Sequence, residues 1–220
     1  MGYYDTPQLF SLDEDGDIVI GNGNLETNLH LFRMNNYQMI SLEDMVRLSL
    51  DGTKTSVHAN TKIGWVKEGI IYLPNGDIFI TKNSPILDNL GNAAAYNKVH
   101  KEYYLSPEDI KKALSNAIKI KLPKNTSCLE LPDIESCEFG KNEITKFLYG
   151  QFATQYGEHL SKVGVKGILF HFYEHPVKQP FARQLYISGV GFLQTINGDF
   201  PGLHTAQYTT GDKNKYYSQI

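Results

Sequence analysis

The sequence predicts an α+β protein in which antiparallel hairpins accompany about three helices, the longest of them, about residues 141–163, packed on a sheet. Three observations lead to this fold class. Turn residues separate pairs of short β-prone runs, one helix has a complete start signal, and a long amphipathic segment leads through a glycine into a β-branched run. A chain of 220 residues can bury a core without disulfides or a structural metal.

The hairpins are predicted from turn chemistry. Two pairs of β-prone runs flank polar turns, residues 9–12 with 17–20 and residues 69–73 with 77–81. The second turn contains Asn75-Gly76. Asn-Gly favours a tight hairpin turn because both residues tolerate positive φ.

Three helices are predicted. Ser41 to Asp44 resembles a capping box and starts the first helix, whereas Ser106-Pro107 starts the second with an N-cap and a proline at the first helical position. The apolar positions of this second helix extend to Ile118, so it is expected to end before Pro123. The third helix, 141–163, carries apolar residues along one side, and Gly164 suits its C′ position. Residues 165–173 and 184–188 are predicted strands.

We expect a single α+β domain over residues 1–220. Residues 123–140 are acidic and rich in turn residues, so they form either a linker or an inserted loop. As a linker, this segment would divide the chain into parts 1–122 and 141–220.

Composition and charge exclude several classes of protein. With 21 Lys and Arg against 24 Asp and Glu, the chain is unlike a basic nucleic-acid binder. No secretory signal is found, and no apolar run approaches the roughly 18 residues of a membrane span. We therefore expect a virion or cytoplasmic location and no contact with a membrane. Cys128 and Cys137 are too few for a disulfide framework or a zinc site, and are expected to be free thiols.

One metal-binding motif is present in outline. His171, Glu174 and His175 match the H-x-x-E-H pattern of inverted zinc peptidases, which requires both histidines on one helical face. Pro176 and the β-prone residues before the motif favour a strand instead. A strand would separate the two histidines by about 13 Å, which is too far for one metal ion. No cofactor is predicted.

Two charged segments are interpreted as solvated surface. The acidic residues 13–17 do not place ligands at the ends of a calcium loop, so they are interpreted as a hairpin turn. A lysine-rich stretch lacks arginines and interleaved aromatic residues, which argues against nucleic-acid binding. It comprises Lys111, Lys112, Lys119, Lys121 and Lys124.

The function hypotheses rest on the two ends of the chain and on the lack of a catalytic motif. Both ends are polar but carry apolar or aromatic side chains that could dock on a neighbouring subunit, namely Tyr3, Tyr4, Tyr216, Tyr217 and Ile220. Residues with A/T-rich codons are plentiful, which is typical of many phages and of low-GC bacteria. The leading hypothesis is a non-enzymatic subunit of a phage or viral assembly, with other protein subunits as partners in a homo-oligomer or hetero-assembly.

Two alternatives stay open. The first is a metal-dependent hydrolase or nuclease with a site around His171 and His175, to which Glu174 also contributes. The second is a small phage-encoded regulator that binds a host protein.

Overall fold

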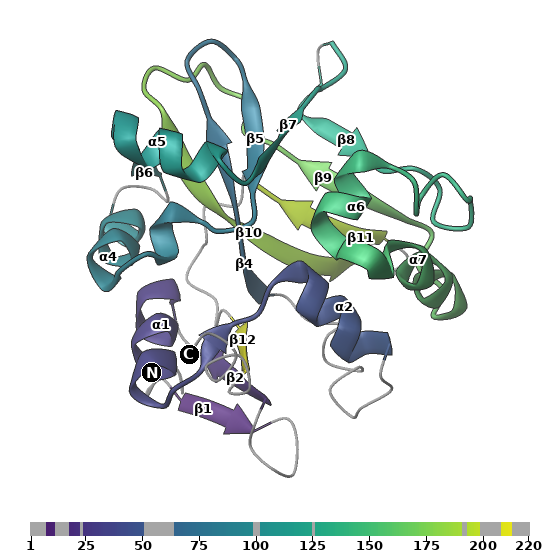
Figure 1. Ribbon diagram of the computed structural model, residues 1–220, viewed down its shortest axis with the longest axis horizontal. Helices are drawn as coiled ribbons and strands as arrows, with labels where there is room; N and C mark the ends of the chain where they lie inside the picture. Colours follow the sequence, from purple (N-terminus) through teal and green to yellow (C-terminus); the bar gives the residue numbers. More distant parts are fainter. Residues whose placement is uncertain are drawn as a thin grey trace, which may run out of the picture.

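The strands of the computed structural model form one mixed sheet, which has 12 strands among the described residues (Figure 1). The structure describes residues 8–11, 18–22, 24–50, 64–98, 102–124, 126–190, 193–198 and 208–212. The strands are β1 (Gln8–Ser11), β2 (Ile18–Asn22), β3 (Gln38–Met39), β4 (Gly64–Tyr72), β5 (Ile78–Thr81), β6 (Tyr103–Tyr104), β7 (Ala117–Ile120), β8 (Cys128–Glu130), β9 (Gly167–His171), β10 (Phe181–Val190), β11 (Leu193–Asn197) and β12 (Tyr208–Asp212). The main path of the sheet is β1-β2-β12-β4-β10-β11-β9-β8.

Helices cover the sheet on both sides. The α-helices are α1 (Leu25–Met34), α2 (Leu42–Leu50), α4 (Leu90–Lys98), α5 (Pro107–Leu114), α6 (Glu143–Tyr149) and α7 (Ala153–Lys162). Two short 3-10 helices, η1 (Pro85–Leu87) and η2 (Gly150–Phe152), join longer elements. In Figure 1, α1, α4 and α5 lie on the left of the sheet, and α2, α6 and α7 lie on the right.

The central strand β4 changes its neighbour on one side halfway along its length. Its first residues, Gly64 and Trp65, pair in parallel with β12, whereas Gly69–Tyr72 pair antiparallel with β5. The other side of β4 pairs with β10, and the register of that pairing shifts between Gln184 and Tyr186. In Figure 1, β5 and β7 therefore lie in the upper part of the view, and β12, β2 and β1 lie in the lower part. The sheet forks in the middle of β4.

The two faces of the β4–β10 ladder carry separate apolar cores, because side chains alternate between the faces of a strand. Ile70 and Tyr72 join the first core, which is closed by α2, α6 and α7. Trp65 and Ile71 join the second core, which is closed by α1, η1, α4 and α5. Apolar residues therefore occupy both faces of β4, interrupted by Lys67 and Glu68.

The predicted fold class, antiparallel hairpins with about three helices of which 141–163 is the longest, is wrong. The sheet is mixed, because β9 pairs in parallel with β11 and β4 pairs in parallel with β12. Strands, rather than one long helix on hairpins, form the centre of both cores. Turn residues predict only pairings between neighbours in sequence, whereas β4 pairs with β10 and β12 from the far end of the chain.

Both hairpins predicted from turn residues are confirmed. β1 pairs antiparallel with β2, and β4 pairs antiparallel with β5. In the second turn, Gly76 has φ of +84°, and the N–H of Asp77 donates to Oδ1 of Asn75 at 3.0 Å. The hairpin is therefore as predicted, but its turn is not the type I′ turn that Asn-Gly favours, because Gly76 has positive φ and Asn75 does not.

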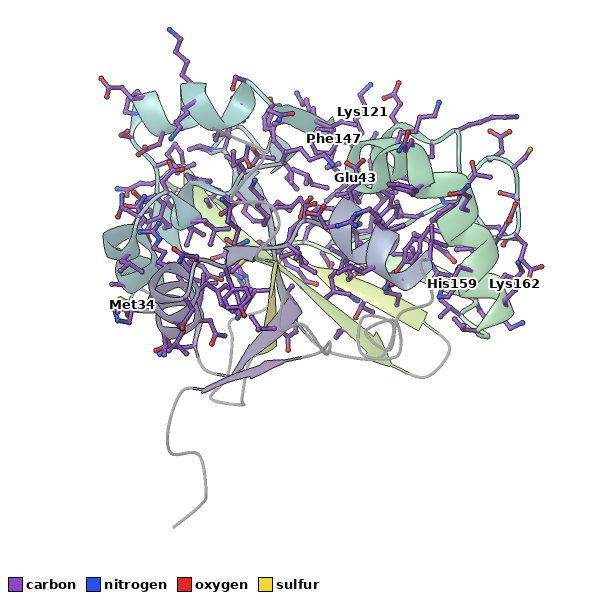
Figure 2. The ribbon with its side chains drawn as sticks, turned by 60° about the horizontal axis from the view of Figure 1, so that its bottom comes forward. Met34, Glu43, Lys121, Phe147, His159 and Lys162 are labelled. Atoms are coloured by element: carbon purple, nitrogen blue, oxygen red, sulfur yellow. The ribbon has the colours of Figure 1, made fainter. Side chains whose placement is uncertain are left out.

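The predicted helix 141–163 is two helices, α6 and α7, that meet at η2. The break occurs at Gly150, whose φ of +58° lies in the region that favours glycine. A Cβ at Gly150 would lie only 2.1 Å from Oε1 of Glu43 on α2. The corner between α6 and α7 therefore approaches α2 closely, and Figure 2 shows Glu43 near Phe147 at this contact. The predicted glycine at the end of α7 is confirmed, since Gly164 has φ of +85°.

The two other predicted helix starts are confirmed. Ser41 and Ser106 each accept from the N–H three residues later, at 3.2 and 3.1 Å. The expected extension of the second helix to Ile118 is wrong, because α5 ends at Leu114 and Ala117–Ile120 forms β7 on the edge of β5. The hydroxyl of Thr81 donates to the carbonyl of Ala113 at 3.0 Å and so satisfies one of the last carbonyls of α5.

The acidic segment 123–140 is integrated into the sheet and the first core. β8 pairs antiparallel with β9, so one part of the segment is the last strand on the main path of the sheet among the described residues. Three apolar side chains that follow it, Leu131, Ile134 and Phe139, are buried in the first core. The apolar residues of this segment thus pack where its composition alone indicates solvated chain.

Candidate binding site

A cavity of about 590 Å³ opens on the side of the second core, where the sheet forks. Segments from α1, β3, β4, η1 and α5 line it, so the cavity is built from parts far apart in sequence. Its apolar lining consists of Leu29, Phe32, Met39 and Leu87, and its charged lining of Arg33, Lys67, Asp88 and Lys112. A volume in this range accommodates a small ligand or a few side chains.

The end of α1 forms the first wall. The N–H of Tyr37 donates to the carbonyl of Phe32 at 2.8 Å, and the N–H of Asn36 donates to that of Arg33 at 3.4 Å. This pattern is a Schellman motif, and Asn36 takes the positive φ, +60°, that the motif requires. The rings of Tyr37 and Phe32 lie 6.4 Å apart between centroids. The motif therefore reverses the chain direction after α1, and the following strand β3 also lines the cavity.

Arg33 joins this wall to η1. Its Nη2 donates to the carbonyls of Leu87 and Asp88, at 3.2 Å each. On the opposite side, Nζ of Lys112 lies 2.7 Å from Oδ2 of Asp88. The hydrogen bond to Asp88 raises the pKa of Lys112 above its ordinary value. Two positively charged side chains thus stand at the rim, anchored to the same short turn.

Lys67 supplies a third positive charge at the fork of the sheet. Its backbone N–H donates to Ile40 at 2.9 Å, and its carbonyl accepts from the N–H of Ser84 at 3.1 Å. The backbone of Lys67 therefore bridges the two branches of the sheet. Its side chain is half-buried, and no carboxylate pairs with it in the part of the chain that the structure describes.

Ser84 and Gly69 fix the separation of the two branches. The side chain of Ser84 is buried, and its hydroxyl has no hydrogen-bond partner among the described residues. A Cβ at Gly69 would lie 2.7 Å from that hydroxyl oxygen. Only glycine lets the chain after β5 approach β4 this closely.

The cavity is lined by positively charged side chains together with apolar side chains, which is the chemistry of an anion-binding site. Three cations and one carboxylate line the cavity, although the whole chain carries a net charge of −3. A smaller hollow of about 130 Å³ adjoins it and shares Asn83, Asp88 and Lys112. The excess of positive charge over negative charge makes this arrangement suited to binding an anion.

Glu68, which follows Lys67, faces the first core. Its carboxylate is fully buried and accepts from the N–H of Leu42, at 3.0 and 3.2 Å, at the start of α2. Burial raises the pKa of Glu68 from 4.5 to about 7, and the hydrogen bond from Leu42 and the nearby charge of Lys82 partly oppose this effect. Consecutive residues of β4 thus supply a cation to the cavity and a carboxyl group to the core.

The strand expected over residues 165–173 is present as β9, and His171, Glu174 and His175 do not come together as a helical zinc motif would require. His171 ends β9, and its Nδ1 lies 3.2 Å from Sγ of Cys128. Glu174 follows the strand and accepts from the hydroxyl of Ser127 at 2.5 Å, whereas His175 packs edge-on against a tyrosine ring, 5.3 Å between centroids. Among the described residues, no group of three or more His, Cys, Asp or Glu side chains could hold a metal ion.

The other predicted site residues fall into two groups. The candidate partner contacts Tyr3, Tyr4, Tyr216, Tyr217 and Ile220 lie outside the described residues. The prediction of free thiols is confirmed for both Cys128 and Cys137. In the lysine-rich stretch, Lys112 lines the cavity as well as being exposed. Sequence reasoning missed the cavity because no local motif connects Arg33, Lys67 and Lys112.

Within the described residues, the structure contains no helix of sufficient length and apolar character to cross a membrane. No family model matches the chain, and no curated protein matches it in sequence. The chain is similar to a solved structure from Nanoarchaeota that concerns the accommodation of massive sequence variation by the C-type lectin fold. The two share 13% identity over 94% of this chain and 97% of the other, with a TM-score of 0.63. The chain therefore has a C-type lectin-like fold with a mixed sheet.

Proposed function

We propose that this chain is a non-enzymatic binding protein that takes an acidic segment of a protein partner into the cavity at the fork of β4. One observation carries the proposal. Arg33, Lys67 and Lys112 line one cavity, together with apolar side chains, in a chain that is acidic as a whole. A partner of this kind is common to the assembly-subunit and regulator hypotheses, and the phage or virion setting has no separate support.

The positive charges are arranged for carboxylates. Arg33 and Lys112 are held at the rim by contacts with η1, so an incoming carboxylate finds them in place. Lys67 lies deeper, half-buried and without an internal carboxylate partner among the described residues. A charge in a partly desolvated site interacts with an anion more strongly than an exposed surface charge does. We therefore expect Lys67 to contribute most to affinity.

The apolar part of the lining favours a peptide over a small inorganic anion. Tyr37 and Leu87 are partly exposed and offer apolar surface beside the cations, above the buried side chains of Leu29, Phe32 and Met39. An acidic segment that also carries an apolar side chain would use both kinds of lining, whereas phosphate would use only the charges. The fold is compatible with this role, because the similar protein from Nanoarchaeota shows that C-type lectin folds accommodate massive sequence variation.

The test uses a short fluorescent peptide that alternates Glu with Leu, and measures its binding by fluorescence anisotropy. Lys67→Glu is expected to weaken binding by at least about tenfold, since it removes one attraction and adds a repulsion, equivalent to about 1.4 kcal/mol or more. Raising the salt concentration is expected to weaken binding to the unchanged protein, because ion pairs at the rim are screened.

Lys121→Glu is the matched control, because it makes the same change in net charge at an exposed lysine. Figure 2 shows Lys121 far from Met34, which ends α1 beside the cavity. This variant is expected to retain binding within about twofold. Equal losses in both variants, or no binding of the acidic peptide at all, would contradict the proposal. Displacement of the peptide by millimolar phosphate alone would identify a small-anion site instead.

A further inference from the structure

We propose that Cys128 is a reactive thiol, activated by His171, that forms mixed disulfides with low-molecular-weight disulfides. This site lies on β8 and β9, shares no lining residue with the cavity, and does not depend on the proposed binding function. It rests on the placement of a thiol and an imidazole on neighbouring strands.

The backbone ladder holds the two groups together. Cys128 and His171 are directly opposite each other in the antiparallel β8–β9 pair, so their side chains lie on the same face. The distance between Sγ of Cys128 and Nδ1 of His171 is 3.2 Å. The carbonyl of His171 accepts from the N–H of Gly198 at 2.8 Å, which also fixes β9 on its other side. Such a thiol–imidazole contact is the arrangement in which imidazole takes the thiol proton.

Polar neighbours surround this pair. The hydroxyl of Thr126 accepts from the N–H of Cys128 at 3.0 Å and donates to its carbonyl at 3.1 Å. The hydroxyl of Ser127 lies 3.9 Å from Sγ of Cys128 and donates to Glu174 at 2.5 Å. The backbone N–H and carbonyl of Cys128 therefore both have hydrogen-bond partners in the side chain of Thr126. The thiol is left to contact His171.

Cys128 lies outside the two apolar cores. Cys128 is half-buried, and β8 is the last strand on the main path of the sheet, with no further strand beside it among the described residues. A thiol in this position resembles the partly exposed cysteines that react in proteins, rather than those buried in a core.

The reaction is thiol–disulfide exchange. Imidazole takes the proton from Sγ, and the resulting thiolate attacks one sulfur of the small disulfide. One S–S bond forms between the protein and that sulfur while the original S–S bond breaks. The departing thiolate then receives the proton from the imidazolium. Cys128 is oxidised and one half of the small disulfide is reduced, so atoms and electrons balance.

The test measures the release of pyridinethione from dithiodipyridine, an uncharged aromatic disulfide. Cys137→Ser leaves Cys128 as the one thiol of the chain, and Cys128→Ser leaves Cys137, which is more exposed and contacts Lys141 at 3.7 Å rather than a histidine. At about pH 6.5, the Cys137→Ser protein is expected to react at least about tenfold faster when folded than when unfolded in urea, because only the fold holds His171 beside Cys128. The Cys128→Ser protein measures the background reaction of Cys137.

A second variant identifies the role of the imidazole. In the Cys137→Ser background, His171→Gln is expected to slow the reaction at least about tenfold near pH 6.5, and by much less near pH 10, where hydroxide replaces the base. A purely structural role of His171 would slow the reaction equally at both pH values. The proposal is overturned if the folded Cys137→Ser protein reacts no faster than the unfolded one at the lower pH, or if the glutamine variant keeps its rate there while its circular dichroism is unchanged.

Discussion

Replacing Trp65 by alanine is expected to lower the free energy of unfolding by about 3–5 kcal/mol. Trp65 lies on the central strand, is 1% exposed, and packs edge-on against Tyr96 and Tyr186 with centroid distances of 6.2 and 4.9 Å. Alanine would leave a cavity in the second core that the rigid β4–β10 ladder cannot close. Urea denaturation followed by circular dichroism measures the loss.

Met34→Ala is the matched control for this prediction. Met34 is 70% exposed at the end of α1, where Figure 2 shows it at the edge of the molecule. This change is expected to alter stability by less than about 0.5 kcal/mol. Trp65→Phe, which keeps an aromatic ring, gives a measurable intermediate if the alanine variant does not fold. A loss below about 1 kcal/mol in Trp65→Ala would contradict the packing of the second core.

The second prediction concerns the pH dependence of stability and the buried carboxyl group of Glu68. The folded state holds this proton with a pKa of about 7, above the ordinary value of 4.5. The folded state therefore binds the proton more tightly than the unfolded state does. The resulting stabilisation is complete below pH 4.5 and is lost as the pH rises through about 7. The interval between the two pKa values corresponds to about 3 kcal/mol.

Glu68→Gln removes this titration and keeps an oxygen that can accept from Leu42. Between about pH 5 and pH 8.5, the unchanged protein is expected to lose about 2–3 kcal/mol of stability relative to the glutamine variant. Urea denaturation of both proteins at both pH values gives the change in the free energy of unfolding with pH for each. The difference between these two changes is due to Glu68, because all other titrating groups are the same in both proteins. Glu43→Gln, at a carboxylate that is 39% exposed, is expected to follow the unchanged protein. If the Glu68→Gln protein has the same pH dependence as the unchanged protein, Glu68 is ionised without cost in the fold.

Local parts of the structure could be predicted from the sequence because short-range chemistry determines them. The hydroxyl of Ser106 and the carboxylate of Asp109 form a reciprocal capping box, and the Asn75-Gly76 turn joins two paired strands. Each of these features is decided by residues within a few positions of one another. Gly150 shows the limit of this reasoning, since its helix break depends on a contact with Glu43 from a distant helix.

The cavity could not be predicted for the same reason. Arg33 lies in the last turn of a helix, Lys67 lies within a strand, and Lys112 lies on an exposed helical turn, and each is ordinary in its local context. Their convergence depends on the pairing of β4 with β12 on one branch and with β5 on the other. The pairing of Cys128 with His171 likewise depends on the register of β8 and β9.

The forked central strand also has a consequence for the order in which the chain can fold. β4 meets β5 early, but its partners β10 and β12 come from the last part of the chain, with Tyr72 opposite Phe181. Closing such long loops costs chain entropy before any hydrogen bond is gained, which places folding in the slow range typical of non-local β-structure. During synthesis on the ribosome, β4 can therefore pair with β5 at once, but its pairing with β10 and β12 forms only after those strands have left the ribosome.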